Sequence, residues 1–191
     1  PVDNVTAVGI NADLTITFDE TVDVETGDIT IRRSDNNLFE TIDVTTAKVT
    51  GTGTTAITIN PDNTFASETE YYVQIDASCF DDPTGNSYAG IADTTTWSFT
   101  SEDVTDPAVS SLSPLDNATG VGSTDNLVIT FDEAVNVGSG SIVIKKTSDD
   151  SVFETVDVNS GQISGAGTAA ITINPAGTFT SEIEYYVLID A

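Results

Sequence analysis

The sequence predicts an all-β protein made of two tandem antiparallel β-sandwiches. Its apolar residues alternate with threonine and other polar residues in short runs, which is the period of half-buried strands. No segment has the 3.6-residue period of an amphipathic helix. The second half of the 191-residue chain also repeats the first. A repeat this long indicates tandem domains, because the repeats of a solenoid are much shorter.

Matching blocks fix the internal repeat. Residues 14–20 (LTITFDE) correspond to residues 127–133 (LVITFDE), with an offset of 131 − 18 = 113. Residues 70–73 (EYYV) correspond to residues 184–187 (EYYV), with an offset of 185 − 71 = 114. One residue is therefore inserted between the blocks, in the polar stretch 147–151. We expect a surface turn there, because turns tolerate insertions.

Each repeat is expected to contain up to seven strands, separated by segments rich in Gly, Asn and Asp. In repeat 2 they are predicted at 108–112, 127–133, 141–146, 152–158, 169–173 and 184–190. Asp132 and Glu133 are expected to close the second of these. The strand at 152–158 is expected to run on through Ile163 to a Gly-rich hairpin at 164–167. Repeat 1 adds a last strand at 96–99.

Period-2 alternation also predicts the core of repeat 1, because alternate side chains of a strand point to the same face. The predicted core residues are Leu14, Ile16, Phe18, Ile57, Ile59, Tyr71, Val73, Ile75, Trp97 and Phe99. Thr15, Thr17 and Thr58 are expected on the solvent face.

The predicted boundaries are 1–100 for repeat 1 and 101–191 for repeat 2, each long enough for its own core. Pro1 matches Pro114, so repeat 1 is expected to lack the first strand. Repeat 2 has no counterpart of residues 78–100 and is expected to lack the last strand. The strand at 184–190 then has an open edge, which tends to recruit another chain. We expect the sequence to come from a longer array.

Seven alternating strands in about 100 residues favour an immunoglobulin-like or fibronectin-like sandwich. Phe65 lies six residues before Tyr71, and Phe179 lies six residues before Tyr185. This spacing predicts a tyrosine corner in each repeat, in which the phenol holds the crossover to nearby backbone. A plain aromatic core residue is the alternative.

Several phrases resemble a known family. Residues 113–119 (SPLDNAT), 129–135 (ITFDEAV), 184–187 (EYYV) and 97–100 (WSFT) are similar to the bacterial Ig-like repeats of S-layer proteins and large secreted adhesins. The resemblance covers essentially the whole chain. It implies a sandwich fold, a tandem context at the cell surface or outside the cell, and no catalytic residues. Members of the family differ in whether they bind calcium.

The charge is strongly acidic. Thirty-one Asp and Glu residues stand against five Lys and Arg, and there is no His, so the net charge is −26. Such a chain repels nucleic acid and anionic membranes and attracts divalent cations. We expect neither nucleic-acid binding nor membrane insertion. Acidity also keeps a secreted protein soluble without any cation site.

Acidic residues gather around the linker at 100–107. The strand at 127–133 returns toward the linker, so its last residues are expected at the same end of repeat 2. The candidate metal ligands are Glu102, Asp103, Asp106, Asp132 and Glu133. Calcium takes six to eight oxygen ligands in flexible geometry, and crowded carboxylates repel one another without a cation. We therefore expect calcium as the cofactor, with a solvated acidic junction as the alternative.

The function predicted is that of a non-catalytic spacer in a bacterial surface or secreted adhesin. A nucleophilic triad is unavailable without His or a matched Cys or Ser. The expected partners are neighbouring repeats of the same polypeptide, and a cell-surface or glycan ligand would be bound by regions outside this sequence. The alternatives are a carbohydrate-binding module or an accessory region of a secreted polysaccharide-degrading enzyme. A binding module would display exposed aromatic residues, whereas most aromatic residues here fall at the inward-facing positions of the period-2 pattern.

Overall fold

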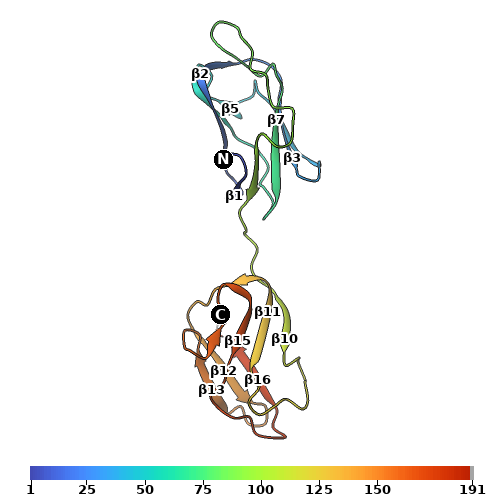
Figure 1. Cartoon of the computed structure of the whole chain (residues 1–191), viewed down its shortest axis with the longest axis vertical. Coiled ribbons are helices and arrows are strands. Elements are labelled where there is room, and N and C mark those ends of the chain that lie inside the picture. Colours follow the sequence, from blue (N-terminus) through green and yellow to red (C-terminus); the bar gives the residue numbers. More distant parts are fainter. Residues whose placement is uncertain (190–191) are drawn as a thin grey trace. The chain divides into compact units, whose positions relative to one another are not determined.

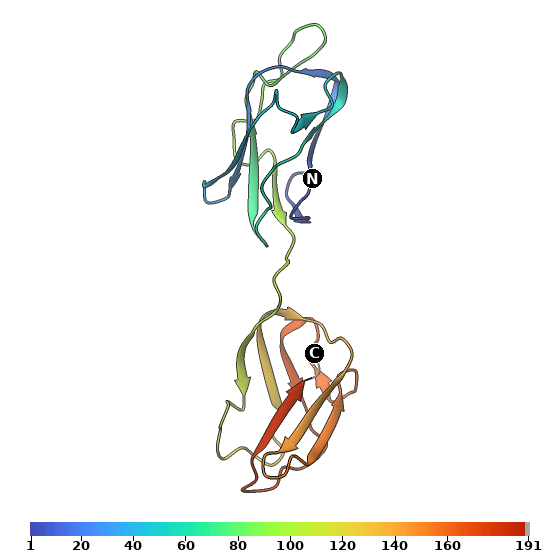
Figure 2. The same ribbon diagram turned by 180° about the vertical axis from the view of Figure 1, so that it is seen from behind.

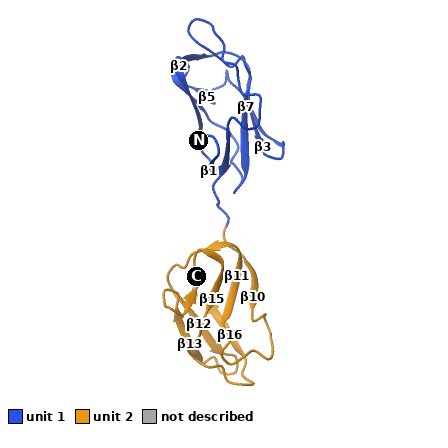
Figure 3. Cartoon of the chain, in the orientation of Figure 1, with its two compact units in different colours: residues 1–105 blue, residues 106–191 orange. Residues whose placement is uncertain are grey.

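The computed structural model describes residues 1–189 and divides the chain into two compact units, 1–105 and 106–191 (Figures 1 and 3). Each unit consists of two β-sheets packed over a core, which confirms the predicted all-β class and the two sandwiches. No helix that could span a membrane occurs in residues 1–189.

The strands of unit 1 are β1 (Val5–Val8), β2 (Leu14–Val24), β3 (Asp28–Arg33), β4 (Leu38–Asp43), β5 (Val49–Thr50), β6 (Thr54–Ile59), β7 (Glu70–Ile75), β8 (Phe80–Asp81) and β9 (Ser98–Ser101). Those of unit 2 are β10 (Val109–Ser113), β11 (Leu127–Val135), β12 (Ser141–Lys146), β13 (Val152–Asp157), β14 (Ile163–Ser164), β15 (Thr168–Ile173) and β16 (Tyr185–Ile189).

Unit 1 has one sheet in the order β1-β9-β7-β3-β4 and a second in the order β5-β6-β2-β8. The predicted core is largely confirmed. Buried residues of the predicted set are Leu14, Ile57, Ile59, Tyr71, Val73, Ile75, Trp97 and Phe99. Ile16 and Phe18 are half-buried and pack against the same cluster. Thr15 and Thr17 are exposed, as the alternation requires, whereas Thr58 is half-buried between the buried Ile57 and Ile59.

Unit 2 has one sheet in the order β10-β11-β15-β14 and a second in the order β13-β12-β16. Its buried cluster is formed by Ile129, Ile142, Val156 and Ile173. The apolar residues again alternate along each strand, but many are only half-buried. Unit 2 therefore shares the pattern of unit 1 with a smaller core.

The second long strand of unit 2 extends further than predicted. Asp132 and Glu133 lie inside β11 instead of closing it, because β11 continues to Val135 and its pairing with β15 shifts after Thr130. Gly167 N–H donates to Val135 O at 2.8 Å, so the Gly-rich hairpin pairs with this extension. In that hairpin Gly165 has φ +97°, and a Cβ there would meet Ala170 O at 2.0 Å.

The predicted continuous strand from 152 to 163 is wrong. β13 pairs with β12, whereas β14 pairs with β15 in the other sheet. An Asx turn separates them, because Asp157 Oδ1 accepts a hydrogen bond from Asn159 N–H at 2.8 Å. Asp43 Oδ1 accepts from Thr45 N–H in the same way between β4 and β5. At these turns the chain crosses from one sheet to the other.

Three other segments differ from the prediction. β1 precedes Leu14, where no strand was expected, and pairs parallel to β9 through Val5↔Phe99 and Val8↔Ser101. Positive φ angles at Asn4 and Ala7 interrupt the regular alternation of side chains along this segment. The sequence pattern therefore does not reveal β1 as a strand. β8 lies in the predicted loop before β9 and pairs with the end of β2.

The last strand of unit 2, β16, spans Tyr185–Ile189, and the predicted strand residue Asp190 lies outside the described residues.

Both tyrosine corners are present. Ala66 N–H donates to Tyr71 Oη at 2.9 Å, and Thr180 N–H donates to Tyr185 Oη at 3.0 Å. Each phenol therefore holds the crossover that leads into its own strand, β7 or β16. The six-residue spacing from Phe65 and Phe179 predicted this contact.

Candidate functional site

The first and last strands of unit 1 are locked together by residues 1–4. Asp3 Oδ1 accepts hydrogen bonds from Ser98 N–H at 2.8 Å and Ser98 Oγ at 3.2 Å. Asn4 N–H donates to Ser98 O at 2.8 Å, and Trp97 Nε1–H donates to Pro1 O at 3.0 Å. These contacts fix β9 between β1 and β7, so the two ends of the unit are joined side by side.

Two predicted metal ligands lie at the end of unit 1. Glu102 is half-buried, and its Oε1 accepts a hydrogen bond from Ile10 N–H at 3.0 Å. Asp103 is exposed, and its Oδ1 accepts from Ser67 Oγ at 3.0 Å and Thr105 N–H at 2.9 Å. Both carboxylates therefore order the segment that follows β9.

The other three predicted ligands belong to unit 2. Asp132 Oδ1 accepts from Ala108 N–H at 2.8 Å, and Asp132 N–H donates to Ala108 O at 3.0 Å. This pair holds Asp132 beside the start of β10, at the linker end of unit 2. Asp106 is exposed, and Glu133 is half-buried within β11.

Glu102 and Asp103 thus belong to unit 1, and Asp106, Asp132 and Glu133 belong to unit 2. Among residues 1–189 no three His, Cys, Asp or Glu side chains are grouped so that they could hold a metal ion. Three of the five use a carboxylate oxygen to accept a backbone N–H. Calcium binding by Glu102, Asp103, Asp106, Asp132 and Glu133 stays a prediction.

Sequence reasoning missed an equivalent glutamate in each unit, Glu40, which is buried, and Glu154, which is half-buried. Glu40 Oε1 accepts from Lys48 Nζ at 2.8 Å and Asp62 N–H at 3.1 Å, and its Oε2 accepts from Asn63 N–H at 3.1 Å. Glu154 makes the equivalent contacts to Gln162 Nε2, Ala176 N–H and Gly177 N–H. Each carboxylate clamps the loop that follows β6 or β15. The sequence does hold a signal for these contacts. Each glutamate lies two residues before an inward-facing apolar residue, Ile42 or Val156, and therefore occupies an inward-facing position of its strand.

The electrostatic environment keeps Glu40 ionised. Burial alone would raise the pKa of this carboxyl, but the hydrogen bonds from Lys48 and the N–H groups of Asp62 and Asn63 outweigh it. The pKa of Glu40 therefore lies below its ordinary value of 4.5. Lys48 Nζ also lies 2.6 Å from Asp62 Oδ2, so the lysine bridges two carboxylates.

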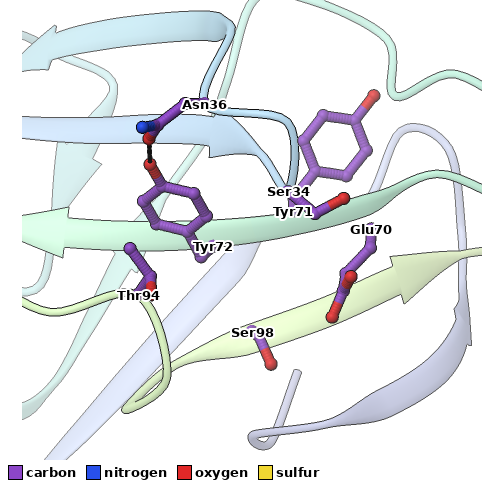
Figure 4. Close-up of a pocket in the computed structure, with 7 residues that line it drawn as sticks. All are labelled: Ser34, Asn36, Glu70, Tyr71, Tyr72, Thr94 and Ser98. Carbon is purple, nitrogen blue, oxygen red and sulfur yellow. Dashed lines mark hydrogen bonds between the residues drawn. The ribbon is translucent and has the colours of Figure 1, made fainter.

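A cavity of about 360 Å³ opens on unit 1 beside β7 and is shown in Figure 4. Its lining residues are Ser34, Asn36, Glu70, Tyr71, Tyr72, Thr94 and Ser98. The Tyr72 hydroxyl is hydrogen-bonded to Asn36 Oδ1, and the Tyr72 side chain is buried. The cavity therefore offers polar groups without an exposed aromatic ring.

Both halves of the chain match one family model, the bacterial Ig-like domain, over residues 1–101 and 103–191. The chain belongs to the bacterial Ig-like domain family. Among solved structures, the chain is similar to the crystal structure of the S-layer protein rSbsC, with 12% sequence identity and a TM-score of 0.37. The match covers 96% of this chain and 25% of that chain. No curated protein matches the sequence.

Most aromatic residues of the two Ig-like domains pack on the sandwich cores, whereas Tyr72 and Tyr186 lie on the opposite faces of β7 and β16 from Tyr71 and Tyr185. Every Phe, Tyr and Trp of the sequence lies within residues 1–189, and each is buried or half-buried. In unit 1 they form a connected cluster in which Phe99 contacts both Phe65 and Tyr71, with ring centroids 5.1 and 5.6 Å apart. Stacking on a sugar or a base requires an exposed ring face, and none of these aromatic residues is in the exposed class.

The single cysteine has the surroundings of a core residue. Cys79 is buried in the Ig-like domain of unit 1. Burial raises the pKa of its thiol to about 11, and nearby Asp76 adds to the shift. The thiol is therefore protonated at neutral pH, which makes it a poor nucleophile and a poor metal ligand.

Proposed function

We propose that the two Ig-like domains are non-catalytic spacers in a large bacterial adhesin or S-layer-type protein that is secreted or displayed at the cell surface. Family membership and the tandem repeat support this proposal. The aromatic residues, each of which is buried or half-buried, favour it over a carbohydrate-binding module, and over an accessory region of a polysaccharide-degrading enzyme that binds glycan. The observation that carries the proposal is the pairing of β1 with β9.

This pairing suits a module that bears tension along the chain. β1 and β9 run parallel, and the chain enters unit 1 just before β1 and leaves it just after β9. Opposite forces on the two ends therefore slide the strands past each other. All the hydrogen bonds between them are then loaded together, whereas strands pulled apart from one end break their bonds one by one. The Asp3–Ser98 and Trp97–Pro1 contacts add to the same joint.

Single-molecule force spectroscopy on the whole chain, held at residues 1 and 191, tests the spacer proposal. We expect two unfolding steps, the one at higher force releasing unit 1 with a length gain on the order of 30 nm. Asp3→Ala should lower that force, because Ser98 loses its carboxylate partner. Asp35→Ala is the matched control, since Asp35 accepts from Asn37 in the turn between β3 and β4. Equal unfolding forces for the two variants would contradict the proposal.

We also propose that calcium, bound by the acidic residues at and beside the linker, stiffens the chain. The net charge of −26 and the candidate ligands Glu102, Asp103, Asp106, Asp132 and Glu133 support this. Calcium would relieve the repulsion between these carboxylates. At free calcium about a hundred times the dissociation constant, binding would stabilise the chain by about 2.7 kcal/mol.

Melting and small-angle scattering with calcium and with chelator test the calcium proposal. We expect calcium to raise the melting temperature on the order of 10 °C and to extend the maximum dimension. Asp103→Asn with Asp132→Asn should abolish both responses. Asp43→Asn with Asp157→Asn is the control, because it removes the same charge from equivalent turns of the two repeats. If chelator changes neither quantity in the unsubstituted chain, the acidity serves solubility alone.

A further inference from the structure

The strands β7 and β9 lie side by side in unit 1 (Figure 2), and the polar cavity of about 360 Å³ opens over them on the face turned away from the core (Figure 4). Two lining residues form its floor, because Tyr72 and Ser98 pair across the strands and are only 5% and 6% exposed. The exposed lining residues Ser34, Glu70 and Thr94 form its rim. The turn after β3, the start of β7 and the loop before β9 therefore meet around one space.

The floor and the rim of this cavity differ in how their polar groups are paired. On the floor, the Tyr72 hydroxyl donates to Asn36 Oδ1, and Ser98 Oγ donates to Asp3 Oδ1 at 3.2 Å. Within residues 1–189 the three rim side chains make no hydrogen bond or ion pair. One carboxylate and two hydroxyls at the rim can therefore accept hydrogen bonds from a ligand.

The charge at the cavity is negative. Glu70 is the one charged residue among the seven that line it. Arg32 lies opposite Tyr72 on β3, but it does not line the cavity, and its Nη1 donates to Asn36 O at 3.0 Å. The whole chain has a net charge of −26, which attracts cations. The cavity therefore favours a positively charged ligand.

The rim also determines which kind of cation fits. Calcium takes about six to eight oxygen ligands, several of them carboxylates. Here one carboxylate is present, and no three Asp, Glu, His or Cys side chains of residues 1–189 are grouped to hold a metal ion. A primary ammonium instead has three N–H donors, which match the carboxylate and the two hydroxyls. A cavity of about 360 Å³ also has room for the alkyl chain that carries the ammonium.

We propose that this cavity binds a primary alkylammonium ion, which is either the side chain of a lysine on a partner protein or a free alkyl diamine. The Glu70 carboxylate accepts a charge-assisted hydrogen bond from the ammonium. The hydroxyls of Ser34 and Thr94 accept the other two. Tyr72 and Ser98, each held by its own hydrogen bond, keep the floor in place. The site goes beyond a spacer role, because it lets unit 1 hold a cationic partner.

An NMR titration of the whole chain with Nα-acetyl-lysine methylamide and with putrescine tests the proposal. The ionic strength is set to about 0.15 M, where charges more than about 8 Å away are screened. We expect amide shifts that saturate and that centre on Tyr72, Thr94 and Ser98. Nα-acetyl-norleucine methylamide has the alkyl chain without the ammonium and should bind at least about tenfold more weakly. The amine that binds more tightly identifies the source of the ammonium.

Substitutions in the chain separate the cavity from the general acidity. Glu70→Gln should weaken the binding of both amines about tenfold, because the charged acceptor is lost and the shape is kept. Glu184→Gln, an equal charge change at the equivalent position of repeat 2, should leave the affinity unchanged. Ser34→Ala with Thr94→Ala should weaken binding about threefold. All four side chains are exposed, so the urea transition followed by Trp97 fluorescence should stay in place and show that the variants are folded.

Three results would overturn the proposal. The first is a titration in which the shifts do not saturate. The second is a neutral norleucine derivative that binds as tightly as the lysine derivative. The third is an equal loss of affinity in Glu70→Gln and Glu184→Gln, because the amines would then bind the acidic surface in general through the net charge of −26.

Discussion

Among single residues, the two corner tyrosines make the same hydrogen bond in different surroundings. Tyr71 is fully buried and accepts from Ala66 N–H at 2.9 Å, whereas Tyr185 is half-buried and accepts from Thr180 N–H at 3.0 Å. A backbone donor that loses its partner in a buried place stays unsatisfied, but an exposed one is solvated by water. Removing the tyrosine hydroxyl should therefore lower the free energy of unfolding more in unit 1 than in unit 2.

Tyr71→Phe should destabilise unit 1 by about 1–2 kcal/mol, because it leaves the ring in place and removes the acceptor of Ala66 N–H. Trp97 is the only tryptophan and lies in unit 1, so its fluorescence during urea unfolding reports that unit alone. Tyr185→Phe is the matched control and should leave the Trp97 transition in place. A Tyr71→Phe transition that coincides with the unsubstituted one would show that the corner adds no stability.

Glu40 makes the stability of unit 1 depend on pH. Its pKa in the folded chain lies below the ordinary value of 4.5, so the folded state favours the ionised form. This contribution is complete above the unfolded pKa and is lost as the pH falls through the lower folded pKa. Lys48 gives unit 1 an ion pair that unit 2 lacks, since Gln162 takes its place beside Glu154.

Glu40→Gln should lower the free energy of unfolding of unit 1 by about 1–3 kcal/mol at pH 7, because one amide oxygen replaces two charged acceptors. The difference from the unsubstituted chain should shrink as the pH falls below 4.5, where the glutamate loses its advantage. Trp97 fluorescence in urea at pH 7 and at pH 3 measures it. A difference that is equal at the two pH values would rule out ionised Glu40 as its cause.

At the scale of strands, the sequence was a good guide wherever alternation is regular. β2, β6, β7 and β12 and their inward faces follow from period 2, because one side of each strand packs on the core. β1 was missed because positive φ angles at Asn4 and Ala7 break the period. The change of sheet after β13 was missed because an Asx turn at Asp157 leaves the apolar pattern intact.

The candidate sites were harder to predict than the strands. Acidic residues are easy to find, but which of them accept a backbone N–H depends on local turn geometry. Asp103 and Asp132 prove to order the chain at the ends of the two units. Glu40, which is buried, and Glu154, which is half-buried, were missed because a charged residue at an inward-facing position of a strand looks like a simple break of the apolar alternation. Where units meet through a linker, sequence gives the order of the acidic residues and not their distances.

At the scale of the whole molecule, two repeats with nearly the same sequence pattern have unequal cores. In unit 1 the buried cluster extends from Val8 to Phe99, and β9 covers the edge of β7. In unit 2 the buried cluster has Ile129, Ile142, Val156 and Ile173, while Val187 and Ile189 remain exposed. Each apolar side chain left exposed forgoes roughly 1–2 kcal/mol of burial.

The two units should therefore unfold separately, with unit 2 first. In urea, circular dichroism of the whole chain follows both units and should show two transitions. Trp97 fluorescence follows unit 1 and should show only the second, at the higher urea concentration. Val73→Ala, which removes buried methyl groups, should move the Trp97 transition by about 1–3 kcal/mol, whereas Val187→Ala should move the first transition by less than about 1 kcal/mol. A single transition at the same urea concentration by both probes would contradict this prediction. It would show that unit 2, despite its smaller core and the exposed side chains of β16, is as stable as unit 1.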